Sequence, residues 1–174
     1  MNEYHKLRVR TMSRIISTDD IIPGRYKHMY TDTDELAKHV FENIFPGLAD
    51  TFAPGDVICS TDTFGIGSSR EQAVSSLISA GIHAVIAPRF GRIFFRNAWN
   101  LGLVAIEIAR LPITEGDQIS IDLDSGELRG DFGLTRFAPP PNRMLEMVKQ
   151  GGLLAMISRQ LASQSSLNEG GTPQ

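Results

Sequence analysis

The chain has 174 residues, of which 41% are hydrophobic and 21% are charged, and its formal net charge is −3. A chain of this length buries about 70% of the surface of its unfolded form, so we expect one domain that folds without disulfides or a structural metal. The mild negative charge gives no reason to expect nucleic acid or an anionic membrane as a partner. The sequence has no apolar stretch near the roughly 20 residues of a membrane span and no signal-peptide core at its polar start, which predicts a cytoplasmic protein.

Apolar patterning predicts the elements of the N-terminal third. Residues 6–10 alternate basic and apolar side chains, which predicts a half-exposed strand. In residues 15–26, Ile-Ile-Ser-Thr-Asp-Asp-Ile-Ile-Pro-Gly-Arg-Tyr, turn-forming residues separate two apolar pairs. Residues 27–30 are predicted to form a loop. Residues 32–45 begin with acidic side chains and carry an apolar stripe, which predicts an amphipathic helix.

The sequence from residue 56 to residue 81 predicts a strand, a glycine turn and a helix start. The apolar run 56–60 leads into Phe-Gly-Ile-Gly-Ser-Ser-Arg-Glu at residues 64–71, and the apolar residues that follow have helical spacing up to Gly81. Gly65 and Gly67 permit backbone conformations that let a ligand approach the main chain closely. Ser68 and Glu71 match the capping-box pattern, so Ser68 is predicted to be the N-cap of this helix.

The glycine turn carries the candidate site residues. The N–H groups and the dipole of the predicted helix start favour an anion or a developing alkoxide at Ser68. The guanidinium of Arg70 matches a carboxylate in a bidentate geometry. The lysine of a nucleotide P-loop is absent, so an acidic substrate is favoured over a phosphate group. A purely structural interpretation also remains open, because glycine turns before capped helices are common in α/β proteins.

The second half of the chain continues the alternation of strands and helices. Residues 82–87 form a nearly continuous apolar run, residues 88–100 predict a helix and residues 103–108 a third strand. This order predicts parallel pairing through right-handed crossovers. Residues 116–128 predict an antiparallel hairpin and residues 144–148 a short helix. The predicted fold class is therefore α/β, with a mixed, mainly parallel sheet flanked by helices and a C-terminal antiparallel hairpin.

The domain prediction is a single domain of residues 1–162, followed by a polar, Gly- and Ser-rich tail of residues 163–174 that is predicted to be disordered. Cys59 is the only cysteine, so the chain forms no internal disulfide and lacks the several thiolates that an iron–sulfur cluster usually takes. Its place in the apolar run predicts a buried core residue. His39 has no second ligand at a suitable spacing, and we predict no metal site in this chain.

The Gly-Ser-Ser-Arg-Glu motif at residues 67–71 is similar to the signature of the swivelling domain of the aconitase superfamily. A free-standing chain of this size resembles the small subunits of 3-isopropylmalate dehydratase, also called isopropylmalate isomerase. Residues 17–26 and 90–98 resemble further motifs of this family, although Ser17 stands where many members have aspartate. The resemblance covers residues 7–157 and implies an aconitase-type swivel domain.

This resemblance implies a hydro-lyase that isomerises 2-isopropylmalate and 3-isopropylmalate in leucine biosynthesis by removing and returning water. In the family, a [4Fe-4S] cluster lies on a separate large subunit, which implies a heterodimer or heterotetramer that is inactive without that subunit. The motif maps the proton-abstracting base onto Ser68, and substrate carboxylate binding onto Ser69 and Arg70 beside Gly67. A further loop corresponds to the one that reads the variable side of the substrate, and it consists of Lys27, His28, Met29 and Tyr30.

Several alternatives remain open from the sequence. The same chemistry also suits alternative substrates, namely homocitrate with homoaconitate, 2-methylmalate with citraconate, or a dimethylmalate, because the reacting atoms are shared and only the pocket differs. The glycine-serine turn also fits a non-catalytic module that binds an anion or a nucleotide. Arg92 and Arg96 lie four residues apart on one helical face and suit an acidic substrate, an acidic partner or a solvated basic face.

Overall fold

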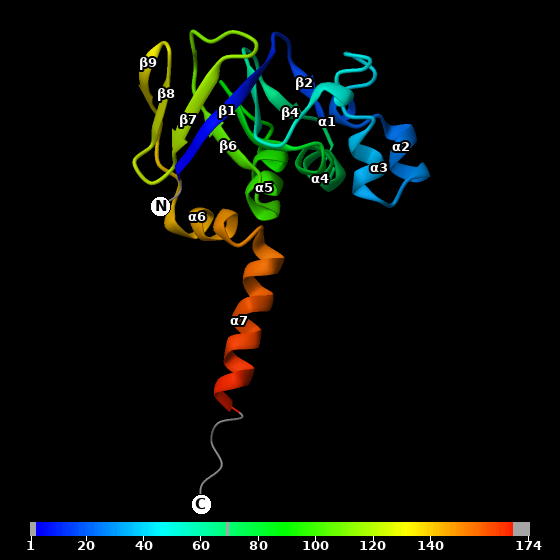
Figure 1. Cartoon of the computed structure of the whole chain (residues 1–174). Helices are drawn as coiled ribbons and strands as arrows, with labels where there is room; N and C mark the ends of the chain where they lie inside the picture. Colours follow the sequence, from blue (N-terminus) through cyan, green and yellow to red (C-terminus); the bar gives the residue numbers. More distant parts are fainter. Residues whose placement is uncertain (1–2, 69, 169–174) are drawn as a thin grey trace, which may run out of the picture.

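In this computed structural model, which describes residues 3–68 and 70–168, seven strands form one sheet in the order β6-β5-β3-β1-β7-β8-β9 (Figure 1). These strands are β1 (Glu3–Met12), β3 (Asp56–Ser60), β5 (Ile82–Ala87), β6 (Val104–Glu107), β7 (Gln118–Asp122), β8 (Glu127–Gly130) and β9 (Gly133–Arg136). A separate two-stranded sheet pairs β2 (Ile16–Ser17) with β4 (Phe64–Ile66). The small sheet carries the start of the glycine turn.

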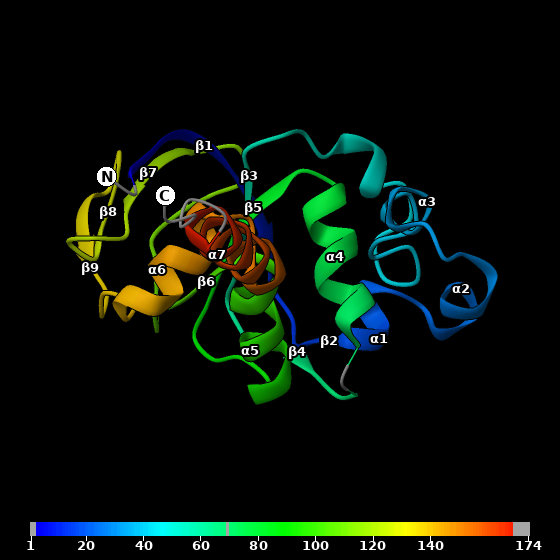
Figure 2. The same cartoon turned by 90° about the horizontal axis from the view of Figure 1, so that it is seen from below.

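The part of the large sheet from β6 to β1 is parallel, which confirms the prediction. β3 pairs in parallel with both β1 and β5, and β5 pairs in parallel with β6. Helices α4 (Glu71–Ser79) and α5 (Arg92–Leu101) connect these strands and lie side by side (Figures 1 and 2). β5 is buried along almost all of its length, as expected for a strand covered on both faces.

The other part of the large sheet is antiparallel. β7 pairs with β1 and with β8, and the β7–β8 hairpin was predicted from its alternating pattern and turn residues. β9 completes the sheet by pairing with β8 and was not predicted. Its side chains are mostly exposed, so it has no alternation of apolar and polar residues that would signal a strand.

Two local predictions in the N-terminal third are wrong. Residues 27–29 belong to helix α2 (Gly24–Met29), with Tyr30 as its C-cap, rather than to a loop. The helix predicted over residues 32–45 is only α3 (Thr33–Ala37), and turns follow it. Phe41 is in the left-handed region, with a φ of 61°, and a right-handed helix cannot continue through that backbone conformation. The preceding helix α1 (Thr18–Ile21) and the 3-10 helix Ala49–Thr51 are short.

The C-terminal helices are α6 (Asn142–Lys149) and α7 (Leu153–Asn168). α7 packs its beginning against α5 and α6 and then projects away from the body (Figure 1). Residues 163–168 are helical where a disordered tail was predicted, so the boundary at residue 162 falls inside α7. The division into domain and tail stays a prediction, and residues 169–174 lie outside the described residues. Within the described ranges, no helix combines the length and apolar character needed to cross a membrane.

The core contains Cys59, as predicted. The residue is 4% exposed, and burial raises the pKa of its thiol to about 12, so the thiol stays protonated at neutral pH. It belongs to one continuous core that includes apolar side chains of both sheets and of α5. The largest fully buried side chains are Trp99, Phe41, Phe64, Phe94, Met12, Ile16, Ile21, Ile22, Leu36, Ile58, Leu77 and Ile86.

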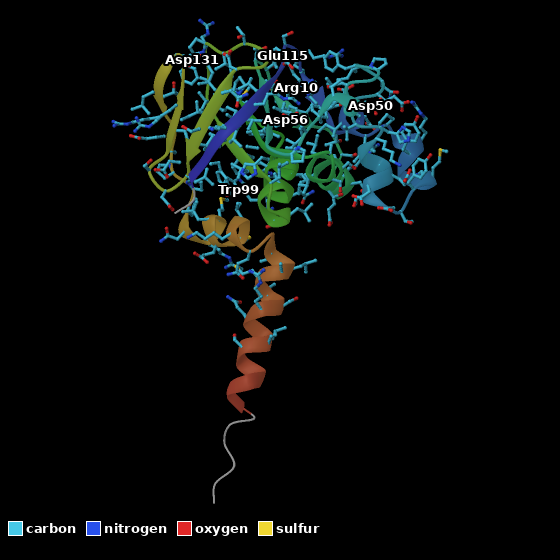
Figure 3. The ribbon with its side chains drawn as sticks, in the orientation of Figure 1. Arg10, Asp50, Asp56, Trp99, Glu115 and Asp131 are labelled. Carbon is cyan, nitrogen blue, oxygen red and sulfur yellow. The ribbon has the colours of Figure 1, made fainter. Side chains whose placement is uncertain are left out.

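Arg8 and Arg10 of β1 belong to a cluster of charged side chains. Because Arg10 is buried, β1 is less exposed than the half-exposed strand predicted for residues 6–10. Arg10 is 8% exposed and lies between Asp56 and Glu115, as Figure 3 shows. Its guanidinium contacts Glu115 Oε1 at 2.6 Å and Asp56 Oδ2 at 3.3 Å. Arg8 adds a second cation, with its Nη2 2.7 Å from Asp56 Oδ2. The cluster ties β1 to β3 and to the loop before β7.

Candidate active site

The Ser68 loop connects β4 to α4 and depends on two glycines. Gly65 and Gly67 have φ values of 76° and 104°, a region that favours glycine. A Cβ on Gly65 would overlap the ring of Phe94, and a Cβ on Gly91 would overlap the carbonyl group of Gly65. The close approach predicted here therefore exists. What approaches Gly65 is the start of α5 rather than a ligand.

Ser68 is not the N-cap of α4, and the predicted capping box is wrong. The helix begins at Glu71 with Arg70 as its N-cap, which makes no side-chain capping bond. The Arg70 N–H donates to the Ser68 carbonyl at 2.9 Å, and this turn inserts Arg70 between the serine and the helix. The Ser68 side chain is exposed and free of the capping role. Ser69 lies outside the described residues.

Arg70, in the motif at residues 67–71, contacts the motif at residues 17–26. Its side chain is 17% exposed, forms an ion pair with Asp19 and donates from Nη1 to the carbonyl of Ile22 at 3.1 Å. Its Nη2 lies 3.6 Å from the position that a Cβ on Gly24 would occupy. The guanidinium is therefore held by α1 and by the start of α2. Sequence patterns assign no role to Asp19, because they are local and do not indicate a contact with a residue as far along the chain as Arg70.

Helix α1 supports the loop through Thr18, a second residue that the sequence analysis missed. Thr18 is 1% exposed, and its hydroxyl donates to the Ser68 carbonyl at 3.2 Å. Ser17 caps α1, since its hydroxyl accepts from the Asp20 N–H at 3.0 Å and donates to the Asp20 carboxylate at 2.8 Å. Ser17 therefore caps the helix whose Thr18 holds the Ser68 carbonyl.

The predicted substrate-reading segment lies on α2 and its C-cap. Met29 is 63% exposed and His28 is also exposed, while the side chain of Lys27 is not described. The rings of Tyr26 and Tyr30 both stack on His39, with centroids 4.0 and 5.5 Å from that of the histidine.

The guanidinium of Arg25 packs against the Tyr26 ring of this stack. Arg25 lies over the ring of Tyr26, with its Cζ 4.6 Å from the ring centroid, and Nδ1 of His39 is 3.2 Å from the Glu42 carboxylate. The stack thus fixes α2 against residues 39–42. The structure connects α2 to the Ser68 loop through Ile22 and Gly24, both of which lie against Arg70.

Two hollows lie near this region. A shallow one of about 300 Å³ borders the Ser68 loop and is lined by Gly65, Ile66, Gly67, Gly91, Arg92 and Ile93. A more enclosed one of about 330 Å³ lies at the carboxyl ends of the parallel strands and is lined in part by Cys59, Ser60 and Arg110. Neither hollow is lined by Ser68 or Arg70, but the first includes Gly67, which directly precedes Ser68, so we place the candidate site beside the first.

Similar proteins support the interpretation of these motifs. Residues 3–111 match the aconitase C-terminal domain family. The 3-isopropylmalate dehydratase small subunit 1 of Thermotoga maritima is 41% identical over 150 residues, which cover 83% of this chain and 89% of that protein. The 3-isopropylmalate dehydratase small subunit of Nautilia profundicola is 45% identical over 149 residues, which cover 84% and 89%. The chain belongs to the family of 3-isopropylmalate dehydratase small subunits.

A solved structure extends this relationship to the fold. The crystal structure of 3-isopropylmalate dehydratase from Methanocaldococcus jannaschii matches with a TM-score of 0.85 and 36% identity, covering 94% of this chain and 98% of that one. The aconitase-type fold and the family resemblance predicted from the motifs are confirmed. The names of these 3-isopropylmalate dehydratase relatives favour neither the other hydro-lyases nor the anion-binding module.

Proposed function

We propose that this chain is the small subunit of a two-chain hydro-lyase that interconverts 2-isopropylmalate and 3-isopropylmalate by dehydration and rehydration, in leucine biosynthesis. The observation that carries the proposal is the junction of the two family motifs, in which Asp19 and Ile22 hold Arg70 beside Ser68. The relatives named above are 3-isopropylmalate dehydratase small subunits, which supports this substrate over other 2-substituted malates.

Ser68 is the proposed base. Its Oγ, as an alkoxide, takes the proton from the substrate carbon and becomes a hydroxyl, and it returns the proton in the reverse direction. Serine is a poor base in water, so the anion must be stabilised out of solvent. Because Arg70 rather than Ser68 caps α4, the helix start lies beyond the serine and contributes less than the sequence suggested. The support comes from the firmly held loop and from closure of the site by the partner subunit.

Arg70 is the proposed ligand of a substrate carboxylate. Its contacts with Asp19 and Ile22 use Nη1, and among the described residues no hydrogen bond engages Nε or Nη2. Those donors match a carboxylate. Asp19 fixes the orientation of the guanidinium, while Ser69 and the backbone of Gly67 complete the proposed carboxylate site.

The segment of Lys27, His28, Met29 and Tyr30 is the proposed reader of the variable substrate group. The Met29 side chain is apolar and 63% exposed, which suits contact with an isopropyl group once the partner covers it. His28 and Lys27 supply polar and cationic alternatives on the same helix.

The residues of this chain do not fit a [4Fe-4S] cluster. Cys59 is the only cysteine, and its pKa of about 12 keeps it from serving as a thiolate ligand. Within the described ranges, no group of three His, Cys, Asp or Glu side chains is placed to hold a metal ion. The proposal therefore assigns the cluster, which supplies Lewis-acid chemistry, to the large subunit of a heterodimer or heterotetramer.

Reconstitution tests this function. The purified chain and its large subunit together should convert 2-isopropylmalate, and the chain alone, free of iron, should not. Conversion by the isolated chain would contradict the two-chain proposal. A kinetic comparison with 2-methylmalate, homocitrate and dimethylmalate tests the substrate, because the proposal requires the highest kcat/KM for 2-isopropylmalate. A cytoplasmic location, and the lack of nucleic acid or membrane partners, stay predictions.

A further inference from the structure

Large apolar side chains are exposed around the Ser68 loop. Ile66 on β4 is 38% exposed and Ile93 on α5 is 44% exposed, and both line the shallow hollow beside Gly67. Ile15, which immediately precedes β2, is 49% exposed. Single exposed apolar residues are ordinary, whereas a group of them on one surface indicates an interaction site.

Ile66 and Ile93 line the same hollow, and Ile15 immediately precedes the strand that pairs with β4. β2 pairs with β4, with Ser17 opposite Ile66. The Gly91 N–H donates to the Phe64 carbonyl at 2.9 Å, which fixes the start of α5 beside β4. We call the surface formed by β2, β4 and the exposed side of the first turns of α5 the β4–α5 face.

Four arginines lie on the chain segments that carry or adjoin these isoleucines. These exposed arginines are Arg14, Arg89, Arg92 and Arg96. Among the described residues, none of them forms an ion pair with a carboxylate. Arg92 and Arg96 lie on the same side of α5 as Ile93, since Phe94 and Ala98 form its buried side. Asp62, the acidic residue of the neighbouring loop, accepts the N–H of Thr63 at 2.7 Å.

The concentration of free positive charge contrasts with the rest of the molecule. The chain as a whole has a net charge of −3, and most of its other arginines are paired with carboxylates. A surface with an apolar centre and an unpaired cationic rim complements a surface with an apolar centre and an acidic rim. A second copy bound through the same face would set arginines opposite arginines, so a symmetric dimer does not suit it.

We propose that the β4–α5 face docks the large subunit, and that the matching surface of that subunit is apolar at its centre and carries carboxylates around it. The proposal rests on the function above, because Ser68 must meet the subunit that carries the cluster. The face borders the Ser68 loop, so docking there closes the hollow over the serine. The arginines accelerate the encounter and the isoleucines slow dissociation.

Binding kinetics of purified small-subunit variants on the immobilised holo large subunit test this assignment. The double variant Arg92→Glu/Arg96→Glu should associate about tenfold or more slowly at low ionic strength, with a weaker salt dependence. The variant Ile93→Ser should dissociate faster. The matched control is Arg143→Glu/Arg159→Glu, which makes the same charge change at exposed positions of α6 and α7 and should bind as the wild type does.

Catalytic measurements separate docking from substrate binding. The single variant Arg96→Glu, whose side chain does not line the hollow beside Gly67, should also associate more slowly. With enough of it to saturate the large subunit, kcat and KM should equal the wild-type values. Wild-type association of this variant, or a complex of full affinity with a raised KM, would overturn the proposal. A Ser68→Ala variant should bind normally and lose about 10²- to 10⁴-fold in kcat. If it stays active, the proposed function fails, whatever the arginine variants show.

Discussion

Arg70 and Asp19 form an ion pair that ties the serine loop to α1, and Arg70 also donates to the carbonyl of Ile22 at 3.1 Å. Asp19 is 62% exposed, so the pair adds less than about 1 kcal/mol to the stability of the fold. Its importance lies in orientation. The guanidinium is held in one direction before any substrate arrives, which is how a carboxylate-binding group is preorganised.

Replacing Asp19 by asparagine should release the Arg70 guanidinium and lower kcat/KM of the reconstituted pair about tenfold to a hundredfold, since small displacements of a positioned group cost this much. Arg70→Lys should cost at least as much, because lysine cannot bind a carboxylate bidentately. The control is Asp34→Asn, which removes an equal charge from an exposed position in α3. Steady-state kinetics equal for Asp19→Asn and Asp34→Asn would contradict the orienting role.

Gly91→Ala should destabilise the fold by about 1–3 kcal/mol, because the added methyl group overlaps the carbonyl of Gly65 in a well-packed region. Urea unfolding of the small subunit measures this loss. The control is Gly24→Ala, where the nearest atom to the new Cβ is 3.6 Å away and α2 already has helical geometry. An unchanged urea midpoint for Gly91→Ala would show that the loop and α5 are less tightly packed than described.

Asp56 should make the fold sensitive to acid. Burial of this carboxyl is the largest influence and by itself would raise its pKa, but hydrogen bonds from Arg8, Ala53 and Arg10 together lower the pKa below the ordinary value of 3.8. A lowered pKa in the folded state means that the stabilisation is complete above pH 3.8 and is lost as the pH falls through the lower, folded-state value.

The variant Asp56→Asn tests this linkage. It should lose about 3 kcal/mol at neutral pH, since it removes the buried carboxylate that Arg8 and Arg10 share and leaves Arg10 with Glu115 alone. Its stability should fall less steeply than that of the wild type below pH 4. Thermal unfolding at a series of pH values provides the measurement. Asp131→Asn, at an exposed turn at the sheet edge (Figure 3), is the control and should match the wild type. Parallel acid profiles for wild type and Asp56→Asn would refute the assignment.

His39 should influence substrate selection through the stack that holds α2. His39→Ala removes the ring that contacts both Tyr26 and Tyr30, and aromatic pairs contribute about 0.5–1.5 kcal/mol, so KM for 2-isopropylmalate should rise about three- to tenfold with little change in kcat. His39→Phe keeps a ring in place and should restore KM. Equal KM values for the wild type and His39→Ala would show that the stack has no part in binding.

The strands and helices of the parallel half were predictable because their signals are local. The apolar runs at residues 56–60 and 82–87 are buried on both faces, and Gly81, with a φ of 94°, ends α4 as its sequence position indicated. The antiparallel hairpin was predictable for the same reason. β9 was missed because most of its side chains face solvent and show no period.

The details of the site depend on contacts that local patterns do not contain. The spacing of Ser68 and Glu71 fits a capping box, yet the Arg70 N–H binds the Ser68 carbonyl and moves the helix start past the serine. The Arg70–Asp19 pair and the Thr18 support arise only when β2 and β4 come together. The predicted long helix stops at Ala37, and Phe41, which donates its N–H to the Ile21 carbonyl at 2.9 Å, has a left-handed backbone through which a helix cannot continue.

The central claim is that Ser68 of this chain is the base, while the large subunit holds the cluster. Its most direct test is turnover of 2-isopropylmalate by the reconstituted pair carrying Ser68→Ala. Ser79→Ala, at an exposed serine near the end of α4, is the matched control and should leave turnover unchanged. We predict that Ser68→Ala lowers kcat by about 10²- to 10⁴-fold while the complex still assembles, as expected for loss of a positioned base. Turnover by an assembled Ser68→Ala complex at the wild-type rate would contradict the account.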